Sequence, residues 1–123
     1  MTGAGYSDED IERLLDEKQT PTGELYRILG ESLGGNEGFG TNVVAAGKAA
    51  IRNINGRVKR DVCPRLAEPR FRRLIDSSSS ADLISLVAVL ASIISTWGMA
   101  LNATLVAVLL IRLGLRTVCP NLG

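Results

Sequence analysis

The stretch that decides the fold is LISLVAVLASIISTWGMALNATLVAVLLI, residues 83–111, which contains no charged side chain. Asp82 precedes it and Arg112 follows it. An uncharged run of 18 or more residues is a candidate for membrane insertion, and one span takes about 20 helical residues. The stretch is too long for one comfortable span and too short for two, so we expect a break inside it.

The middle of this stretch carries the signals for that break. Trp97-Gly98 interrupts the aliphatic pattern, and Asn102 is a good residue to begin a helix. We therefore predict an apolar helical hairpin over 81–116, with helices near 81–97 and 100–116. A tight turn would bring Asp82 and Arg112 to the same end, where Arg112 would either extend to the membrane interface or form an ion pair with Asp82.

Two environments suit such a hairpin. Basic residues flank it on both sides and its turn carries no charge, which favours membrane insertion with both ends cytoplasmic. Small residues recur at spacings of three and four and would let another helix approach closely; they are Ser85, Ala88, Ser92 and Ser95. The alternative is a soluble helical bundle that buries the hairpin as its core.

Charge divides the rest of the chain into two blocks. The net charge of the whole chain is +1. Residues 1–40 contain nine acidic and three basic side chains, whereas residues 41–76 contain nine basic and three acidic ones. The balances of −6 and +6 predict that the blocks pair with each other, within one chain or between copies.

Residues 1–76 have the patterning of an amphipathic helical module, acidic over 1–40 and basic over 41–76. Apolar residues recur at helical spacing over residues 8–19 and again from Leu25 to Leu33. No segment alternates as a strand would, so the predicted fold class is all-α. Residues 77–80 form a serine linker before the hairpin, and residues 117–123 are expected to be an irregular tail after Pro120.

A seam of apolar and small residues is predicted along a helix that reaches about residue 62. Positions seven residues apart are aliphatic, with further small or aliphatic residues between them, which is a heptad-like pattern that needs a partner helix. The seam residues are Val44, Gly47, Ile51, Ile54 and Val58. Pro64 is expected to push Cys63 out of helical geometry.

The two cysteines lie in similar heptapeptides. RDVCPRL, residues 60–66, and RTVCPNL, residues 116–122, share the form Arg-x-Val-Cys-Pro-x-Leu. Both end a predicted helix, so the two ends are candidates for neighbours in space. The polar, acidic N-terminus lacks the features of a signal peptide. We therefore expect an intracellular chain, on the cytoplasmic side of a membrane or soluble in the cytoplasm, with reduced thiols.

Little in the sequence supports enzymatic chemistry. The chain has no histidine, which removes the commonest general base and metal ligand. The glycine-rich loop 34–40 does not fit a phosphate-binding motif, because Ala49 stands where Ser or Thr would bind magnesium. We expect no catalytic residue, no metal, no cofactor and no small-molecule substrate.

The basic stretch 57–73 has three interpretations. It could pair with acidic helices, lie on an anionic membrane surface, or contact nucleic-acid phosphates. Its residues are Arg57, Lys59, Arg60, Arg65, Arg70, Arg72 and Arg73. A near-zero net charge and a single aromatic residue in the stretch, Phe71, disfavour nucleic acid.

The function expected from the sequence is that of a small non-enzymatic, membrane-associated subunit or effector. It would self-assemble or bind a protein partner through its helical module. The alternatives are a soluble helical-bundle interaction module, such as an adaptor or inhibitory subunit, and a nucleic-acid-binding accessory protein.

Overall fold

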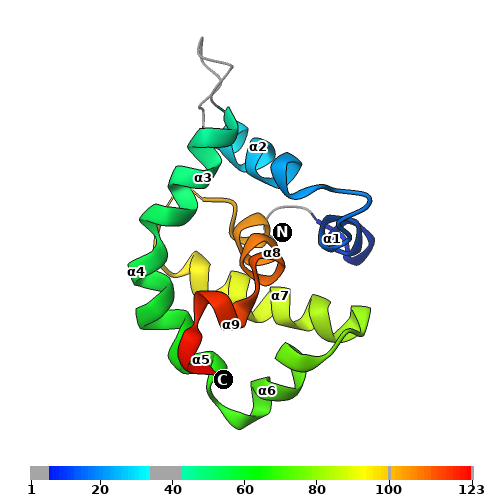
Figure 1. Cartoon of the computed structure of the whole chain (residues 1–123), viewed down its shortest axis with the longest axis vertical. Coiled ribbons are helices and arrows are strands. Elements are labelled where there is room, and N and C mark those ends of the chain that lie inside the picture. Colours follow the sequence, from blue (N-terminus) through cyan, green and yellow to red (C-terminus); the bar gives the residue numbers. More distant parts are fainter. Residues whose placement is uncertain (1–5, 34–42, 100, 123) are drawn as a thin grey trace.

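The fold is all-α, and no residue in the described ranges lies in a strand. A computed structural model describes residues 6–33, 43–99 and 101–122. The glycine-rich loop 34–40 lies outside these ranges. Figure 1 shows the arrangement, with α8 in the middle of the molecule and the other helices around it.

The helices are short, and several follow one another with little or no connection. They are α1 (Asp8–Leu15), α2 (Thr22–Ser32), α3 (Val43–Asn53), α4 (Asn55–Arg57), a π turn (Val58–Val62), α5 (Cys63–Leu66), α6 (Pro69–Asp76), α7 (Ser80–Ser95), α8 (Ala103–Leu113), α9 (Leu115–Val118) and a 3₁₀ turn (Pro120–Leu122).

Helix α8 forms the centre of the core. Six consecutive residues, 105–110, expose at most 2% of their surface, so no face of this part of the helix meets solvent. Helices α1, α2, α7 and α9 all pack against α8. A helix that is apolar all round must be enclosed in this way or lie in lipid.

Membrane crossing finds no support in the helix lengths. Across the part of the chain that the structure describes, every helix is too short or too polar to span a bilayer. The break in the apolar stretch falls near the expected place, since α7 ends at Ser95 and Gly98 follows with a φ of 68°, a conformation that glycine adopts without strain. Asn102 accepts a hydrogen bond from the backbone N–H of Leu105 and so caps α8.

The predicted ion pair between Asp82 and Arg112 is wrong. Arg112 instead donates to the carbonyl oxygens of Leu14, at 2.9 Å, and of Thr20, and to the hydroxyl of Thr22 at 3.1 Å. The connection between α1 and α2 therefore wraps around the end of α8. The helix ends at Leu113, followed by Gly114 with a φ of 98°, which turns the chain into α9.

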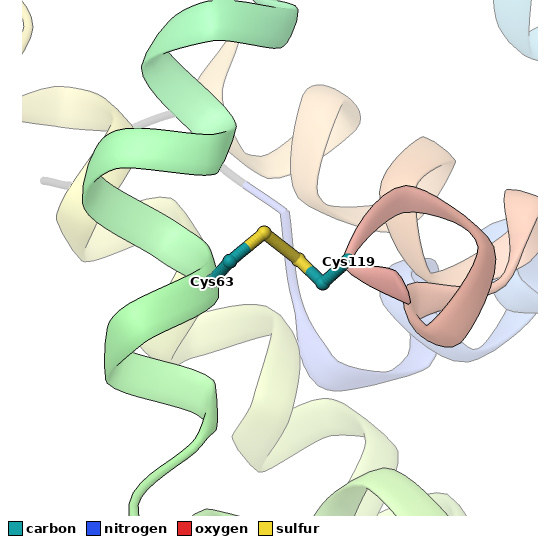
Figure 2. Close-up of a disulfide and its surroundings, with 2 residues drawn as sticks. All are labelled: Cys63 and Cys119. Atoms are coloured by element: carbon teal, nitrogen blue, oxygen red, sulfur yellow. A yellow bond between two sulfur atoms is a disulfide. The ribbon is translucent and has the colours of Figure 1, made fainter. Parts of the chain in front are cut away.

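Two short helical segments, Leu115–Val118 and Pro120–Leu122, form most of the described C-terminal tail, in contrast to the irregular tail predicted for residues 117–123. The short α9 and the 3₁₀ turn fold it back on α5, and Cys119 and Leu122 are buried. Cys63 and Cys119 form a disulfide, with their Cα atoms 5.5 Å apart (Figure 2). The expectation of reduced thiols is therefore wrong for this structure, and the two similar heptapeptides are neighbours.

Pro64 does not end the helix that precedes it. Cys63 keeps helical angles, with φ of −60° and ψ of −42°, and its N–H donates to the carbonyl of Val58, five residues earlier. Proline in a regular helix clashes with the carbonyl four residues before it. The wider π turn relieves that clash, so α4, the π turn and α5 continue as one helical run.

Helices α2 and α3 approach each other at two glycines. A Cβ atom on Gly30 would lie 2.0 Å from the carbonyl oxygen of Val43, and one on Gly47 would lie 2.1 Å from that of Tyr26. The obstructing atoms belong to the backbone, so they cannot move away as a flexible side chain would. Glycine at both positions is what permits this spacing of the two helices.

The glycine contacts predict opposite effects for two Gly→Ala substitutions. Gly47→Ala should lower the free energy of unfolding by at least about 2 kcal/mol, because the added methyl group overpacks the contact between α2 and α3. Gly56→Ala is the matched control, since no atom lies within 4 Å of its added Cβ. It should be neutral or stabilise by up to about 1 kcal/mol. Urea denaturation measures both, and equal midpoints would contradict the close approach.

The disulfide gives a second stability prediction. It links residues 56 positions apart, and the chain-entropy model gives about 4 kcal/mol for a loop of this length. A reducing agent should therefore lower the denaturation midpoint of the wild-type chain. The double variant Cys63→Ser, Cys119→Ser should unfold at the lower midpoint and should not respond to the reducing agent. A wild-type midpoint that is insensitive to reduction would argue against the cross-link.

Candidate functional site

The predicted seam residues lie mostly inside the chain. Gly47, Ile54 and Val58 are buried, whereas Val44 and Ile51 are only partly buried. Val43, at 7% exposed, takes the inward position that the heptad-like pattern gave to Val44. The buried positions of α3 follow the 3.6-residue period of an ordinary amphipathic helix and not a seven-residue repeat. At the start of the helix the buried residue is therefore Val43, one position before Val44. The surface available to a partner on α3 is correspondingly small.

The small-residue face of α7 is open to solvent. Ser85, Ala88, Ser92 and Ser95 are all exposed, while the opposite side of the same helix is buried in the core. No helix among the described residues covers this face. Its short side chains leave the α7 backbone accessible to whatever packs there.

The basic surface is also exposed along its whole length. It consists of Arg57, Lys59, Arg60, Arg65, Arg70, Arg72 and Arg73, on α4, the π turn, α5 and α6. Its ion pairs are local: Arg60 pairs with Asp61 at 2.9 Å, and Arg65 and Arg70 both approach Glu68. Exposed pairs of this kind contribute at most about 1 kcal/mol each. These arginines therefore remain available to an external anion or carboxylate.

The fold brings part of the basic surface, Arg60 and Arg65, and one residue of the small-residue face, Ser92, together in one groove, the interaction groove. It lies between α7 and the run formed by the π turn and α5, and has a volume of about 510 Å³. Arg60, Asp61 and Arg65 line it on one side and Ser92 and Thr96 on the other, and its apolar lining residues are Pro64 and Ile93. The sequence identified both sides but not their juxtaposition.

Asp61 ties the two walls of the interaction groove to each other. Its carboxylate accepts a hydrogen bond from the indole N–H of Trp97 at 2.8 Å and one from Arg60 at 2.9 Å. The Arg60 guanidinium, with help from the Trp97 hydrogen bond, lowers the pKa of Asp61 to about 2. The carboxylate is therefore ionised at any ordinary pH and holds the basic run against the end of α7.

Sequence reasoning missed this contact. The sequence identified Trp97 only as part of a break in the apolar stretch, and Asp61 is a lone acid inside a basic stretch. Thirty-six residues separate them, and no periodicity links positions on different helices. The only available signal was chemical, because a partly buried indole N–H normally finds an acceptor.

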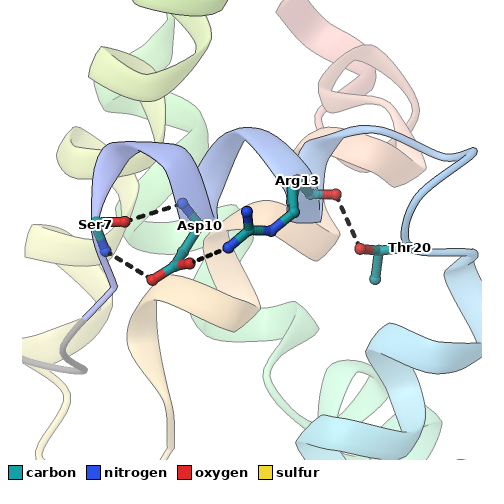
Figure 3. A network of polar contacts seen from close by, with 4 residues as sticks. All are labelled: Ser7, Asp10, Arg13 and Thr20. Atoms are coloured by element: carbon teal, nitrogen blue, oxygen red, sulfur yellow. Dashed lines mark hydrogen bonds and ion pairs between the residues drawn. The ribbon is translucent and has the colours of Figure 1, made fainter.

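Helix α1 carries the main acidic surface. Ser7 and Asp10 form a reciprocal cap at its start, Arg13 pairs with Asp10, and the Thr20 hydroxyl donates to the Arg13 carbonyl at its end (Figure 3). The Ser7 backbone and hydroxyl hydrogen bonds lower the pKa of Asp10. These contacts fix both ends of α1 with its apolar face toward the core. The other acidic side chains of α1 therefore point outward.

A cleft of about 550 Å³ separates the acidic face of α1 from the start of α7, and Glu9, Glu12 and Asp16 contribute to its lining. Within the described ranges, no group of three or more His, Cys, Asp or Glu side chains is placed to hold a metal ion. The acids of α1 are accordingly spread along a helix face and do not converge on a point.

Comparison of the chain with protein-family models, with curated proteins and with solved structures finds no match.

Trp97, the sole tryptophan, makes the Asp61 contact measurable by fluorescence. The Asp61 pKa is lower in the folded chain than in the unfolded one. Its stabilising contribution is therefore complete above about pH 4 and is lost as the pH falls through about 2. We expect Trp97 emission to change over this range in the wild-type chain.

The variant Asp61→Asn isolates this titration from those of other carboxylates. The neutral amide cannot ionise, so the acid-induced change in Trp97 emission should be absent while the chain remains folded, as checked by circular dichroism. The same titration curve in both proteins would mean that another group controls the environment of Trp97.

Proposed function

We propose that this chain is a non-enzymatic helical interaction module that docks an acidic helical segment of a protein partner in the interaction groove. The observation that carries the proposal is the groove itself, where exposed arginines face the small residues of α7. Helix-in-groove recognition needs a concave surface with apolar contacts and a charged rim. An amphipathic helix with acidic flanks fits both requirements.

The placement of the apolar stretch supports an interaction module over a membrane-inserted subunit. The α8 part of that stretch is enclosed by other helices of the same chain, and the exposed side of α7 is made of serine and alanine. Little apolar surface therefore remains for contact with lipid. Of the functions expected from the sequence, the helical-bundle interaction module agrees best with this packing.

The disulfide indicates the kind of compartment in which such a module would act. Disulfides persist in oxidising environments and are rare in the cytosol. The Cys63–Cys119 bond therefore favours an oxidising environment in place of the cytoplasmic one expected from the sequence.

The docking proposal is testable with a labelled, Glu- and Ala-rich helical peptide. Fluorescence anisotropy should show binding to the wild-type chain that weakens as salt rises, because screening shortens the range of the charges. Arg65→Glu should weaken binding by about tenfold or more, since it reverses a charge on the groove wall. Arg52→Glu makes the same charge change at an exposed site on α3 and should bind like the wild type.

Anionic vesicles and duplex DNA provide the competing tests. Tight binding to either one, with no affinity for the acidic peptide, would replace the protein-docking proposal by a membrane-surface or nucleic-acid role. Equal peptide binding by Arg65→Glu and Arg52→Glu would place the contact outside the groove.

A further inference from the structure

The acidic and basic surfaces of this molecule lie apart and do not neutralise each other. In Figure 1, α1 is on one side of α8, and α4 and α5 are on the other. Among the described residues, no ion pair joins the acidic block 1–40 to the basic block 41–76. The pairing within one chain that the charge balance predicted is therefore wrong for these residues. Pairing between copies remains open.

Helix α1 presents its acids as an ordered row. Glu9 and Glu12 are three residues apart on one face of α1, Asp16 follows just past the end of the helix, and all three are exposed. Ile11 and Leu14 take the opposite face and are buried in the core. The row is about 10 Å long at 1.5 Å per residue. Because α1 is already packed on the core, the row can dock without a folding step.

The interaction groove offers the complementary surface. Arg60 and Arg65 line one wall, and across from them the short side chains of Ser92 and Thr96 leave room for a helix. Both arginines are exposed; Arg60 pairs with Asp61, and Arg65 lies 3.9 Å from Glu68, so Arg65 is the more available of the two to a docked carboxylate.

We propose that the acidic face of α1 in a second copy of this chain occupies the interaction groove, a proposal that rests on the docking function inferred above. The charges favour a second copy over a polyanion: with a net charge of +1, the whole chain has no long-range attraction to nucleic acid or to an anionic membrane. Two copies, each with a net charge of +1, repel each other only weakly, and their opposite faces attract at short range.

The geometry sets the kind of assembly. The two contacting surfaces differ and lie on opposite sides of the molecule, so the contact is head-to-tail and leaves one free groove and one free α1 face at the ends. Such contacts add copies one after another. Association should therefore give a series of increasing mass, not a closed two-fold dimer.

Sedimentation velocity of the full oxidised chain tests the assembly. At low ionic strength the average mass should rise with concentration, and in about 0.5 M salt it should fall to that of the monomer, because the Debye length shortens from about 10 Å at 0.1 M to a few ångströms. Arg65→Glu and Glu12→Lys should each raise the dissociation constant by about tenfold or more. Both substitutions are at exposed positions, so the melting temperature should not change. Arg52→Glu should assemble like the wild type.

Mixing the two impaired variants gives the sharpest result. Glu12→Lys keeps an intact groove, and Arg65→Glu keeps an intact α1 face, so one heterologous contact can form between them. Their mixture should restore association, because one unaltered contact forms between the two variants and the two reversed charges are again opposite in sign where the altered surfaces meet. A wild-type chain that stays monomeric at low salt, or a mixture that remains monomeric, would overturn the proposal.

The outcomes also separate this inference from the docking function. A monomeric wild-type chain that still binds the acidic peptide through Arg65 would overturn self-association and leave docking of a different protein in place. A monomeric chain without peptide binding would overturn both. Assembly that neither charge reversal weakens would show that copies meet through another surface.

Discussion

The complete burial of α8 is the constraint on which the rest of the structure depends. A helix with six consecutive residues closed to solvent needs neighbours on every side. Burying a leucine or valine side chain contributes about 1.5–3 kcal/mol, and that gain requires α1, α2, α7 and α9 to remain in place together. The short outer helices therefore depend on α8 for their stability, because isolated helices of 8–11 residues are marginal in water.

Arg112 explains how the N-terminal helices are held at one end of α8. Its partners are backbone carbonyls and a hydroxyl from α1, the following turn and the start of α2, so one side chain fixes three consecutive parts of the chain. The Leu14 carbonyl lies at the C-terminal end of α1, where the helix dipole favours a positive charge. Hydrogen bonds from a charged donor contribute about 1.5–3 kcal/mol each. Carbonyls thus replace the carboxylate that the sequence led us to expect.

Local chemistry made much of the fold predictable. The all-α class followed from the sequence, and the cap at Asn102 and the break at Gly98 could be predicted because each is set by its nearest neighbours along the chain. The continuation of the helix through Pro64 could not be predicted from the sequence, because a π turn depends on the packing of the whole helical run. The seam moved from Val44 to Val43 because the phase of a helix is fixed by its partner, here through the close contact at Gly47.

The candidate site was predictable only in parts. Charge and residue size identified the basic surface and the small-residue face separately, since both are properties of continuous segments. Their meeting in one groove depends on tertiary contacts between positions far apart in the sequence, such as Asp61 with Trp97 and Cys63 with Cys119. The similar heptapeptides around the cysteines were the one sequence signal of long-range proximity.

Helix α7 links the core to the interaction groove. Its inner side, including Leu86 and Leu90, packs in the core, and its outer side forms a wall of the groove. The opposite wall, formed by the π turn and α5, is fixed by two contacts. The Asp61–Trp97 hydrogen bond joins it to the end of α7, and the disulfide joins it to the C-terminal tail. The tail is connected to α8 through α9, and α7 packs directly against α8. Both contacts therefore fix the wall to elements that pack against α8. The width of the groove therefore depends on the packing of α8, although no residue of α8 lines it.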